Sequence, residues 1–200
     1  MGLAPPSVDG AKELKIKICL VGTPGVGKTS LTRRFVYDTF SEKYLYTVGA
    51  NMSKKVLDLT PPGTDERWSV VLIVWDIMGE RTFLDLVKEA YFRGASGVVA
   101  VADLTRPETF GEFDTWIHAV KEVAGADVPV VIFANKVDLV DFQTLDWSPL
   151  ATSAAQHAAP LLPTSAKSGE NVENPFLLIG QLALVTVLRK EARREEAPTA

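Results

Sequence analysis

The sequence predicts an α/β fold, with a mostly parallel six-stranded sheet, one antiparallel edge hairpin and helices on both faces. Apolar strand-like runs alternate along the chain with amphipathic helical segments, and a glycine-rich loop joins the first strand to the first helix. The 200 residues, 46% of them hydrophobic, fit one domain with a full core. We place that domain at residues 13–190, after a disordered leader at 1–12 and before a charged, flexible tail at 191–200.

The expected elements alternate in a way that favours parallel strands, whose carboxyl ends carry the ligand-binding loops. Residues 60–67 are read as the long turn of the edge hairpin. The last helix begins at Asn174 and Pro175, an N-cap followed by a first-turn proline, and frays from Arg189. The expected strands are 16–21, 51–59, 68–75, 97–103 and 130–134, and the other expected helices are 30–40, 82–93 and 110–124.

Residues 22–30 fit the pattern G-x-x-x-x-G-K-[ST] and lie between a predicted strand and a predicted helix. Glycines let backbone N–H groups turn toward phosphates, and the helix start adds unpaired N–H groups and a positive dipole end. We expect Lys28 to reach the β- and γ-phosphates and the Thr29 hydroxyl to ligate Mg²⁺. The predicted phosphate-binding residues are Gly25, Val26, Gly27, Lys28, Thr29 and Ser30.

A second motif, N-K-x-D at residues 135–138, follows a short apolar strand. The Asp138 carboxylate can accept two hydrogen bonds from the guanine N1–H and amine, which adenine does not offer. The stem of Lys136 can lie over the base, and Asn135 can tie this loop to the phosphate loop. Further along, Ser165, Ala166 and Lys167 are expected beside the base, with the Ala166 N–H meeting the guanine O6.

With these motifs in this order, the chain resembles the small GTPases of the Ras superfamily, nearest to the Ras and Rab branches, over residues 14–190. The resemblance implies the fold of a P-loop NTPase G domain and a switch that binds GTP or GDP with Mg²⁺ and slowly hydrolyses GTP. It also implies an effector, an exchange factor and an activating protein that bind through two switch segments, 37–50 and 76–93. Trp75 and Tyr91, which flank the second switch, are either interface or core residues.

The same resemblance assigns roles within the switches. Phe40 would pack edge-on against the guanine, Tyr44 would cover the phosphates, and Thr47 would ligate Mg²⁺ in the GTP state. In the D-x-x-G pattern, Asp76 would hold Mg²⁺ through a water and the Gly79 N–H would sense the γ-phosphate. The implied metal-binding residues are Thr29, Thr47 and Asp76, and the implied catalytic residues are Lys28, Thr47, Gly79 and Glu80.

Glu80 departs from the family, because Ras and Rab proteins usually carry a Gln there that orients the attacking water. An ionised Glu accepts hydrogen bonds but cannot donate one. It also repels the γ-phosphate, by about 3 kcal/mol at roughly 5 Å and an effective dielectric constant near 20. Three alternatives stay open: Glu80 impairs hydrolysis, acts as a base on the water, or points to solvent. The alternative function is therefore a GTP-binding scaffold with little or no hydrolysis.

Pro24 is the second departure, since Ras has Gly in that slot and proline has no N–H. Its ring is either neutral for binding or crowds an arginine supplied by an activating partner. Arg81 is the nearby arginine in the sequence. It is read as a partner of Glu80, as solvated, or as a residue that enters the site of a neighbouring copy, so both a monomer and a nucleotide-dependent dimer are open.

Composition limits the remaining functions. The net charge of −4 with no basic stripe argues against nucleic-acid binding. The single cysteine, Cys19, is expected in the core. No cysteine lies near the C-terminus for prenylation, and Pro6 makes Met1-Gly2 a poor myristoylation signal, so we expect no direct lipid anchor. These observations predict a cytoplasmic protein, and a prokaryotic origin is compatible with them.

Overall fold

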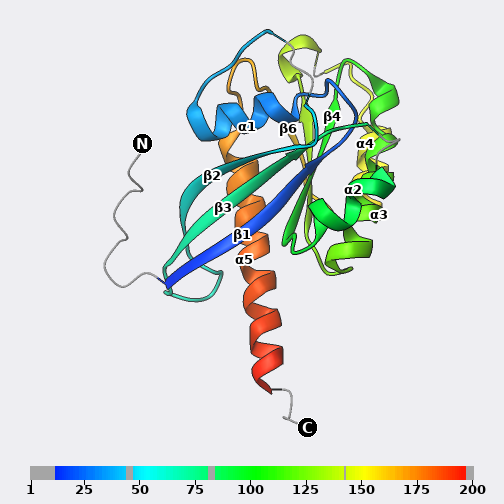
Figure 1. Cartoon of the computed structure of the whole chain (residues 1–200). Helices are drawn as coiled ribbons and strands as arrows, with labels where there is room; N and C mark the ends of the chain where they lie inside the picture. Colours follow the sequence, from blue (N-terminus) through cyan, green and yellow to red (C-terminus); the bar gives the residue numbers. More distant parts are fainter. Residues whose placement is uncertain (1–11, 44–46, 81–83, 142, 197–200) are drawn as a thin grey trace.

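The computed structural model describes residues 12–43, 47–80, 84–141 and 143–196, with only the backbone at 85–87. Its sheet has six strands in the order β2-β3-β1-β4-β5-β6, with β2 antiparallel to β3 and the other neighbours parallel (Figure 1). This confirms the predicted sheet with its antiparallel edge pair. The strands are β1 Lys12–Val21, β2 Ala50–Leu59, β3 Trp68–Ile77, β4 Gly97–Asp103, β5 Val130–Asn135 and β6 Leu161–Thr164.

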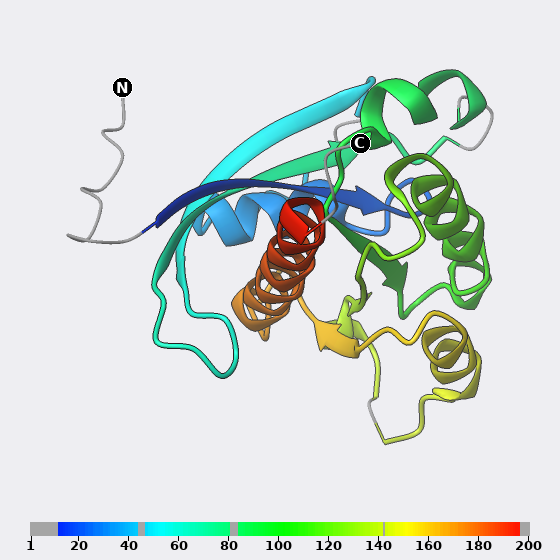
Figure 2. The same cartoon turned by 90° about the horizontal axis from the view of Figure 1, so that it is seen from below.

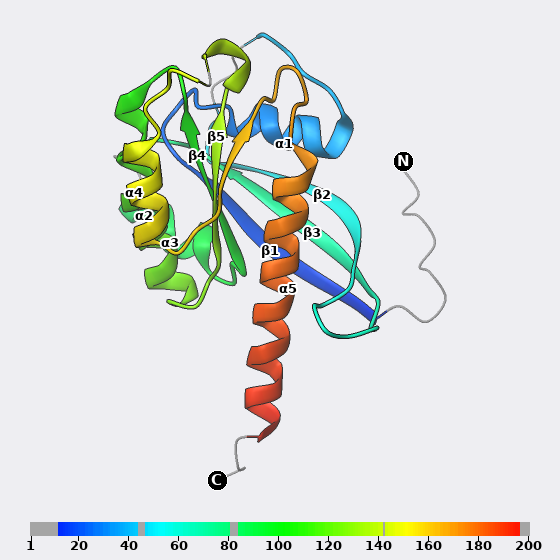
Figure 3. The same ribbon diagram turned by 180° about the vertical axis from the view of Figure 1, so that it is seen from behind.

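Helices cover both faces of the sheet (Figures 2 and 3). One face carries α1 and α5, and the other carries α2, α3 and α4, each over its own hydrophobic cluster. The α-helices are α1 Lys28–Tyr37, α2 Leu84–Phe92, α3 Glu112–Ala124, α4 Ser148–Gln156 and α5 Glu173–Glu196, and the short 3-10 turns are η2 Pro107–Thr109 and η3 Val137–Leu139.

The strand sequences explain the layering. β4 and β5 are buried along their whole lengths, which is the pattern of parallel strands covered on both faces. β2 keeps several exposed polar positions, as expected of an edge strand. Because the parallel strands point the same way, the loops that follow β1, β3, β4, β5 and β6 meet at one edge of the sheet.

The first helix is shorter than expected at its C-terminal end. It ends at Tyr37, whereas the sequence pattern predicted residues 30–40. The reason is local, because Asp38 adopts the left-handed conformation (φ 51°) and its N–H caps the Arg34 carbonyl. The chain is therefore released three residues early, and Phe40 lies in the following loop rather than on the helix.

The last helix is longer than expected. α5 continues to Glu196, past Arg189, where the sequence predicted fraying, and into the segment expected to be a flexible tail. Its C-terminal part extends beyond the sheet, away from α1 (Figures 1 and 3). Within the described ranges, no helix combines the length and apolar character needed to cross a membrane.

Candidate functional site

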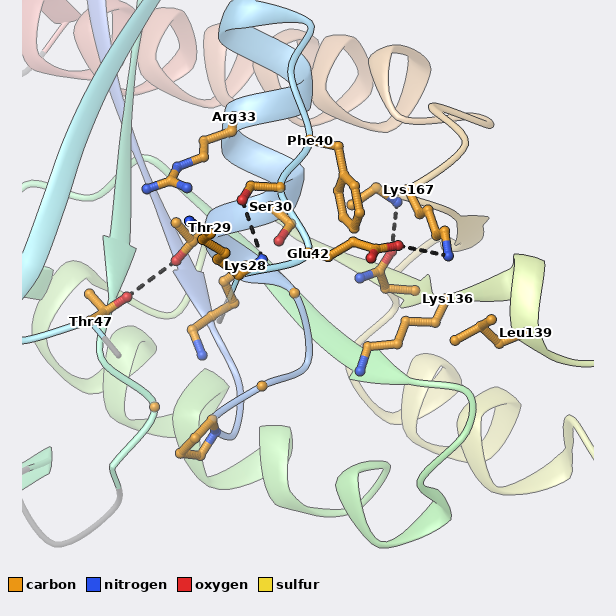
Figure 4. Close-up of a pocket in the computed structure, with 18 of the residues that line it drawn as sticks. Lys28, Thr29, Ser30, Arg33, Phe40, Glu42, Thr47, Lys136, Leu139 and Lys167 are labelled. Carbon is orange, nitrogen blue, oxygen red and sulfur yellow. Dashed lines mark hydrogen bonds and ion pairs between the residues drawn. The ribbon is translucent and has the colours of Figure 1, made fainter. Parts of the chain in front are cut away.

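A cavity of about 330 Å³ opens at the carboxyl edge of the sheet (Figure 4). Loops that follow β1, β3, β5 and β6 contribute to it, together with the start of α1 and the segment after it. The cavity is lined by Pro24, Gly25, Gly27, Lys28, Thr29, Ser30, Arg33, Phe40, Ser41, Glu42, Lys43, Thr47, Ile77, Gly79, Asn135, Lys136, Asp138, Leu139, Ala166 and Lys167. A volume of this size suits a nucleotide-sized ligand.

The phosphate loop turns sharply between β1 and α1. Gly22, Gly25 and Gly27 all have positive φ, at 134°, 77° and 104°, so glycine is required by the backbone. Lys28 is buried, and its ammonium donates to the carbonyl oxygens of Gly22 (2.6 Å) and Thr23 (3.0 Å). Burial lowers the pKa of Lys28 to about 8; nearby Asp76 opposes this shift and Arg106 adds to it.

Three oxygen-bearing side chains predicted to share one metal ion lie together. The Thr29 hydroxyl donates to Asp76 Oδ2 at 2.5 Å and lies 3.2 Å from the Thr47 hydroxyl. These residues come from α1, the end of β3 and the first switch, which are far apart in the sequence. The other carboxylate oxygen of Asp76, Oδ1, is buried without a hydrogen-bond partner among the described residues. Burial raises the pKa of Asp76, although Thr29 and Lys28 counteract it.

Hydrogen bonds with the phosphate loop and with the loop after β6 hold the N-K-x-D loop in place. Asn135 is buried and donates from Nδ2 to the Val26 carbonyl at 2.8 Å, which is the predicted tie to the phosphate loop. Its Oδ1 accepts the Ala166 N–H at 3.2 Å, so that N–H is already engaged rather than free for a base. Asp138 accepts the Ser165 hydroxyl at 2.6 Å, which orients its carboxylate at the cavity.

Around the far end of the cavity, the walls are partly apolar. Figure 4 shows Phe40, Leu139, Lys136 and Lys167 on one side, with Lys28, Thr29 and Thr47 on the other. An ion pair of 3.2 Å joins Lys167 to Glu42 across the mouth. Sequence reasoning gave no role to Glu42, Leu139 or Arg33, because none of them is a defining residue of a nucleotide-binding motif.

A buried carboxylate that the sequence did not single out connects the two motif loops. Asp103, at the end of β4, is fully buried and accepts Lys136 Nζ at 2.5 Å and Arg106 Nε at 2.8 Å. Arg106 also donates to the Pro24 carbonyl at 3.0 Å. Burial would raise the pKa of Asp103, but hydrogen bonds from Lys136, Thr105 and Arg106 hold it below its usual value. The sequence did contain a sign of this role, because Asp103 is a carboxylate at the end of an otherwise apolar strand.

Thr47, the predicted Mg²⁺ ligand, and Gly79, the predicted γ-phosphate sensor, flank one end of the edge hairpin. Ala50 pairs with Ile77 there, and the Met78 N–H donates to the Gly49 carbonyl at 2.9 Å. Gly79 lines the cavity and packs closely against the phosphate loop, since a Cβ on it would lie 2.5 Å from the Gly22 oxygen. The ladder thus places Thr47 and Gly79 just beyond its two strand ends.

Other predicted site residues stand apart. Glu80 is half-buried, does not line the cavity and makes no hydrogen bond or ion pair with any described residue. Val26 and Ser165 are buried and do not line the cavity. Tyr44 and Arg81 lie outside the described residues.

A phosphate loop after β1 and an N-K-x-D loop after β5, joined at one cavity, define a P-loop protein of the guanine-nucleotide-binding class. The profile of the Ras family matches residues 17–184. The chain belongs to the Ras family of small GTPases, and it is a GTP-binding switch protein of that family.

Its relatives include Rab proteins from distant organisms. GTP-binding protein ypt1 of Schizosaccharomyces pombe is 33% identical over 165 residues, which cover 82% of this chain and 78% of that protein. Ras-related protein Rab-13 of Canis lupus familiaris is 33% identical over 178 residues, which cover 89% of this chain and 83% of that protein. Ras-related protein Rab-10 of Diplobatis ommata is 31% identical over 183 residues, covering 92% and 88%.

Proposed function

We propose that this chain binds GTP and GDP with Mg²⁺ in the cavity at the sheet edge and slowly hydrolyses GTP. The observation that carries the proposal is the convergence of Thr29, Thr47 and Asp76 beside the buried Lys28. Chain segments distant in the sequence would have no packing reason to gather two hydroxyls and a carboxylate next to an ammonium. A triphosphate with its magnesium ion accounts for all four groups.

The residues present fit Mg²⁺. This ion takes hard oxygen ligands and usually keeps several of its waters. The orphaned Oδ1 of Asp76 is a buried acceptor that a metal-bound water would satisfy, while Thr29 and Thr47 would hold the ion directly. When bound, Mg²⁺ supplies positive charge that neutralises the phosphate oxygens.

The protein groups would divide the nucleotide between them. Lys28 would exchange the carbonyls of Gly22 and Thr23 for phosphate oxygens, because charge-assisted hydrogen bonds to an anion are stronger. Asp138, oriented by Ser165, would accept from the guanine edge. Phe40 and the stem of Lys136 would flank the base, on the side of the cavity where Figure 4 shows them.

Hydrolysis would depend on positioning and charge neutralisation rather than on covalent chemistry. Lys28 and the phosphate-loop amides would stabilise the transferred phosphoryl group, and Thr47 and Gly79 would close the switches over it. Glu80 lies outside the cavity lining and lacks a donor for the attacking water. We therefore expect intrinsic turnover below about one per minute.

The position of Glu80 also favours a second candidate, a GTP-binding scaffold that barely hydrolyses its nucleotide. Single-turnover GTP hydrolysis with Mg²⁺, for the wild type and Glu80→Gln at several protein concentrations, separates the two. A slow wild-type rate that falls in Glu80→Gln would assign Glu80 a part in hydrolysis. An inert wild type that gains a rate in Glu80→Gln would favour the scaffold, and turnover near one per second would contradict our expected rate.

The concentration series also tests self-association. If a nucleotide-dependent dimer supplies Arg81 to a neighbouring site, the rate per molecule will rise with protein concentration. A constant rate per molecule would leave the monomer as the catalytic unit.

Partners would dock on the two switch segments, 37–50 and 76–93. Support comes from exposed apolar side chains, since Val48 in the first segment is 83% exposed and Met52, just after that segment on β2, is 57% exposed. Trp75 and Tyr91 lie close by, with ring centroids 6.0 Å apart, and both are half-buried. Which effector, exchange factor or activating protein binds remains a prediction, as does a cytoplasmic location, which cell fractionation would test.

A further inference from the structure

Arg106 bridges two groups at the back of the phosphate loop. It lies between β4 and η2, where its Nε donates to Asp103 Oδ2 at 2.8 Å and one terminal nitrogen donates to the Pro24 carbonyl at 3.0 Å. Asp103 is fully buried, whereas the Arg106 side chain is 37% exposed. Arg106 itself does not line the nucleotide cavity, but Pro24 and Gly25 do. The direct contact between Arg106 and the wall of the cavity is therefore its hydrogen bond to the Pro24 carbonyl.

The peptide group between Pro24 and Gly25 links that contact to the cavity. No described peptide bond is cis, so this bond is trans, and its C=O and N–H point in opposite directions within the peptide plane. With the carbonyl held by Arg106, the Gly25 N–H faces the other way. Pro24 has no N–H of its own, so Gly25 supplies the first amide of the predicted phosphate cradle.

Glycine at position 25 makes this orientation costly to maintain without help. Gly25 has φ +77°, and glycine reaches positive and negative φ about equally readily. A peptide plane next to such a residue can rotate unless both of its polar groups are engaged. The guanidinium suits the task, since its rigid fork can bond a carboxylate and a carbonyl at the same time.

Asp103 fixes the Arg106 side chain and also binds Lys136 of the guanine-recognition motif. The same Oδ2 accepts Lys136 Nζ at 2.5 Å, and Oδ1 accepts the Thr105 N–H and hydroxyl. A buried carboxylate is stable only when it is paired in this way. One anion therefore anchors a residue of the guanine loop and the support of the phosphate loop.

We propose that Arg106 is a positioning residue that holds the Pro24–Gly25 peptide with its N–H directed at the nucleotide phosphates, and that it thereby slows nucleotide release. The inference rests on the proposed site but not on hydrolysis. The positive charge of Arg106 also adds to that of Lys28, whose lowered pKa reflects it in part. The test must therefore separate orientation from charge.

Two variants make that separation. Arg106→Met removes both hydrogen bonds, whereas Arg106→Lys keeps the charge but cannot bridge two acceptors in the same geometry. Arg193→Met is the matched control, because Arg193 is exposed in the last turn of α5, outside the cavity lining and both switch segments. Release of methylanthraniloyl-GDP, chased with excess GDP, gives the dissociation rate of each protein.

Arg106→Met should release the probe about tenfold faster than the wild type, as expected for loss of a charged hydrogen bond. Arg106→Lys should resemble Arg106→Met, and Arg193→Met should match the wild type within about twofold. A wild-type rate in Arg106→Lys would overturn orientation in favour of charge alone. A wild-type rate in Arg106→Met would overturn any role.

Thermal unfolding with and without GDP excludes a merely structural effect. A positioning role predicts that Arg106→Met loses part of the GDP-induced rise in Tm, because ligand stabilisation follows affinity. An equal drop in Tm with and without GDP, leaving the rise intact, would overturn the proposal. If the wild type failed to bind GDP, the proposed site and this role would both fall, whereas absence of hydrolysis would affect neither.

Discussion

At Gly79, the addition of a single methyl group should weaken GTP binding more than GDP binding. A Cβ there would lie 2.5–2.7 Å from three backbone atoms of the phosphate loop, belonging to Gly22, Thr23 and Pro24. Backbone cannot yield as a flexible side chain can, so Gly79→Ala should force the second switch away from the loop. Overpacking of this kind typically costs 1–3 kcal/mol.

We expect Gly79→Ala to lower GTP affinity by about tenfold, while GDP affinity stays within about threefold, because GDP has no γ-phosphate for this switch to contact. Titration calorimetry with a non-hydrolysable GTP analogue and with GDP measures both. Gly111→Ala is the control, since a Cβ at Gly111 meets no atom within 4 Å. Equal loss for the two nucleotides would contradict the expectation.

At this scale, the sequence predicted residues whose motif defines their chemistry. Lys28, Asn135 and Asp138 all line the cavity, and Asn135 makes the expected bond to the phosphate loop. Arg106 was not predictable, because one of its partners is a backbone carbonyl 82 positions away, and a carbonyl has no sequence signature. Arg34 escaped for the same reason, since it donates to the Ala166 and Lys167 carbonyls.

Among the elements, α5 depends on one aromatic side chain. Phe176 stacks on Phe35 of α1 with ring centroids 4.1 Å apart, and meets Phe133 of β5 edge-on at 5.1 Å. It is fully buried, so Phe176→Ala should reduce the free energy of unfolding by about 3–5 kcal/mol. Because α1 carries Lys28 and Thr29, nucleotide release should also quicken.

Urea unfolding followed by circular dichroism would measure the loss, with Val48→Ala as the control. Val48 is 83% exposed, so its truncation should change stability by less than about 0.5 kcal/mol. A loss below about 1 kcal/mol for Phe176→Ala would show that the aromatic cluster does not hold the helix.

The one described α-helix that sequence analysis missed is α4. Its residues are mostly small and give no strong apolar stripe, although the Ser148 N–H bonds to Asp146 and Pro149 lies in the first turn. Its anchor is tertiary, since Ser153 and His157 both bond to Asp114 of α3, the latter at 2.8 Å. Contacts between distant side chains leave no local pattern, whereas the buried strands were read from composition alone.

For the whole molecule, Cys19 reports on global opening. It is fully buried in β1, and burial raises the pKa of its thiol from 9.0 to about 12. At pH 8 a thiol reagent should therefore modify the native protein only as fast as the protein opens, and GDP should slow the reaction further. Fast labelling that ignores GDP would contradict a closed core around β1.

The same thiol predicts a pH dependence. Above pH 9.0 the unfolded chain loses this proton while the folded chain keeps it up to about pH 12, so stability falls as pH rises through that window. The stability difference between wild type and Cys19→Ala should narrow by up to about 1.4 kcal/mol per pH unit. Urea titrations at pH 8 and pH 10 measure it, and a constant difference would contradict it.

The edge hairpin links the two switch segments mechanically. Thr47 and Gly79 stand beyond neighbouring strand ends that Ala50, Ile77 and the Gly49–Met78 bond fasten together. If GTP holds both residues, the strand pair couples their positions, so the two switches change conformation together. A partner that binds the open edge of this hairpin, strand β2, would therefore sense the state of both switches without touching the nucleotide.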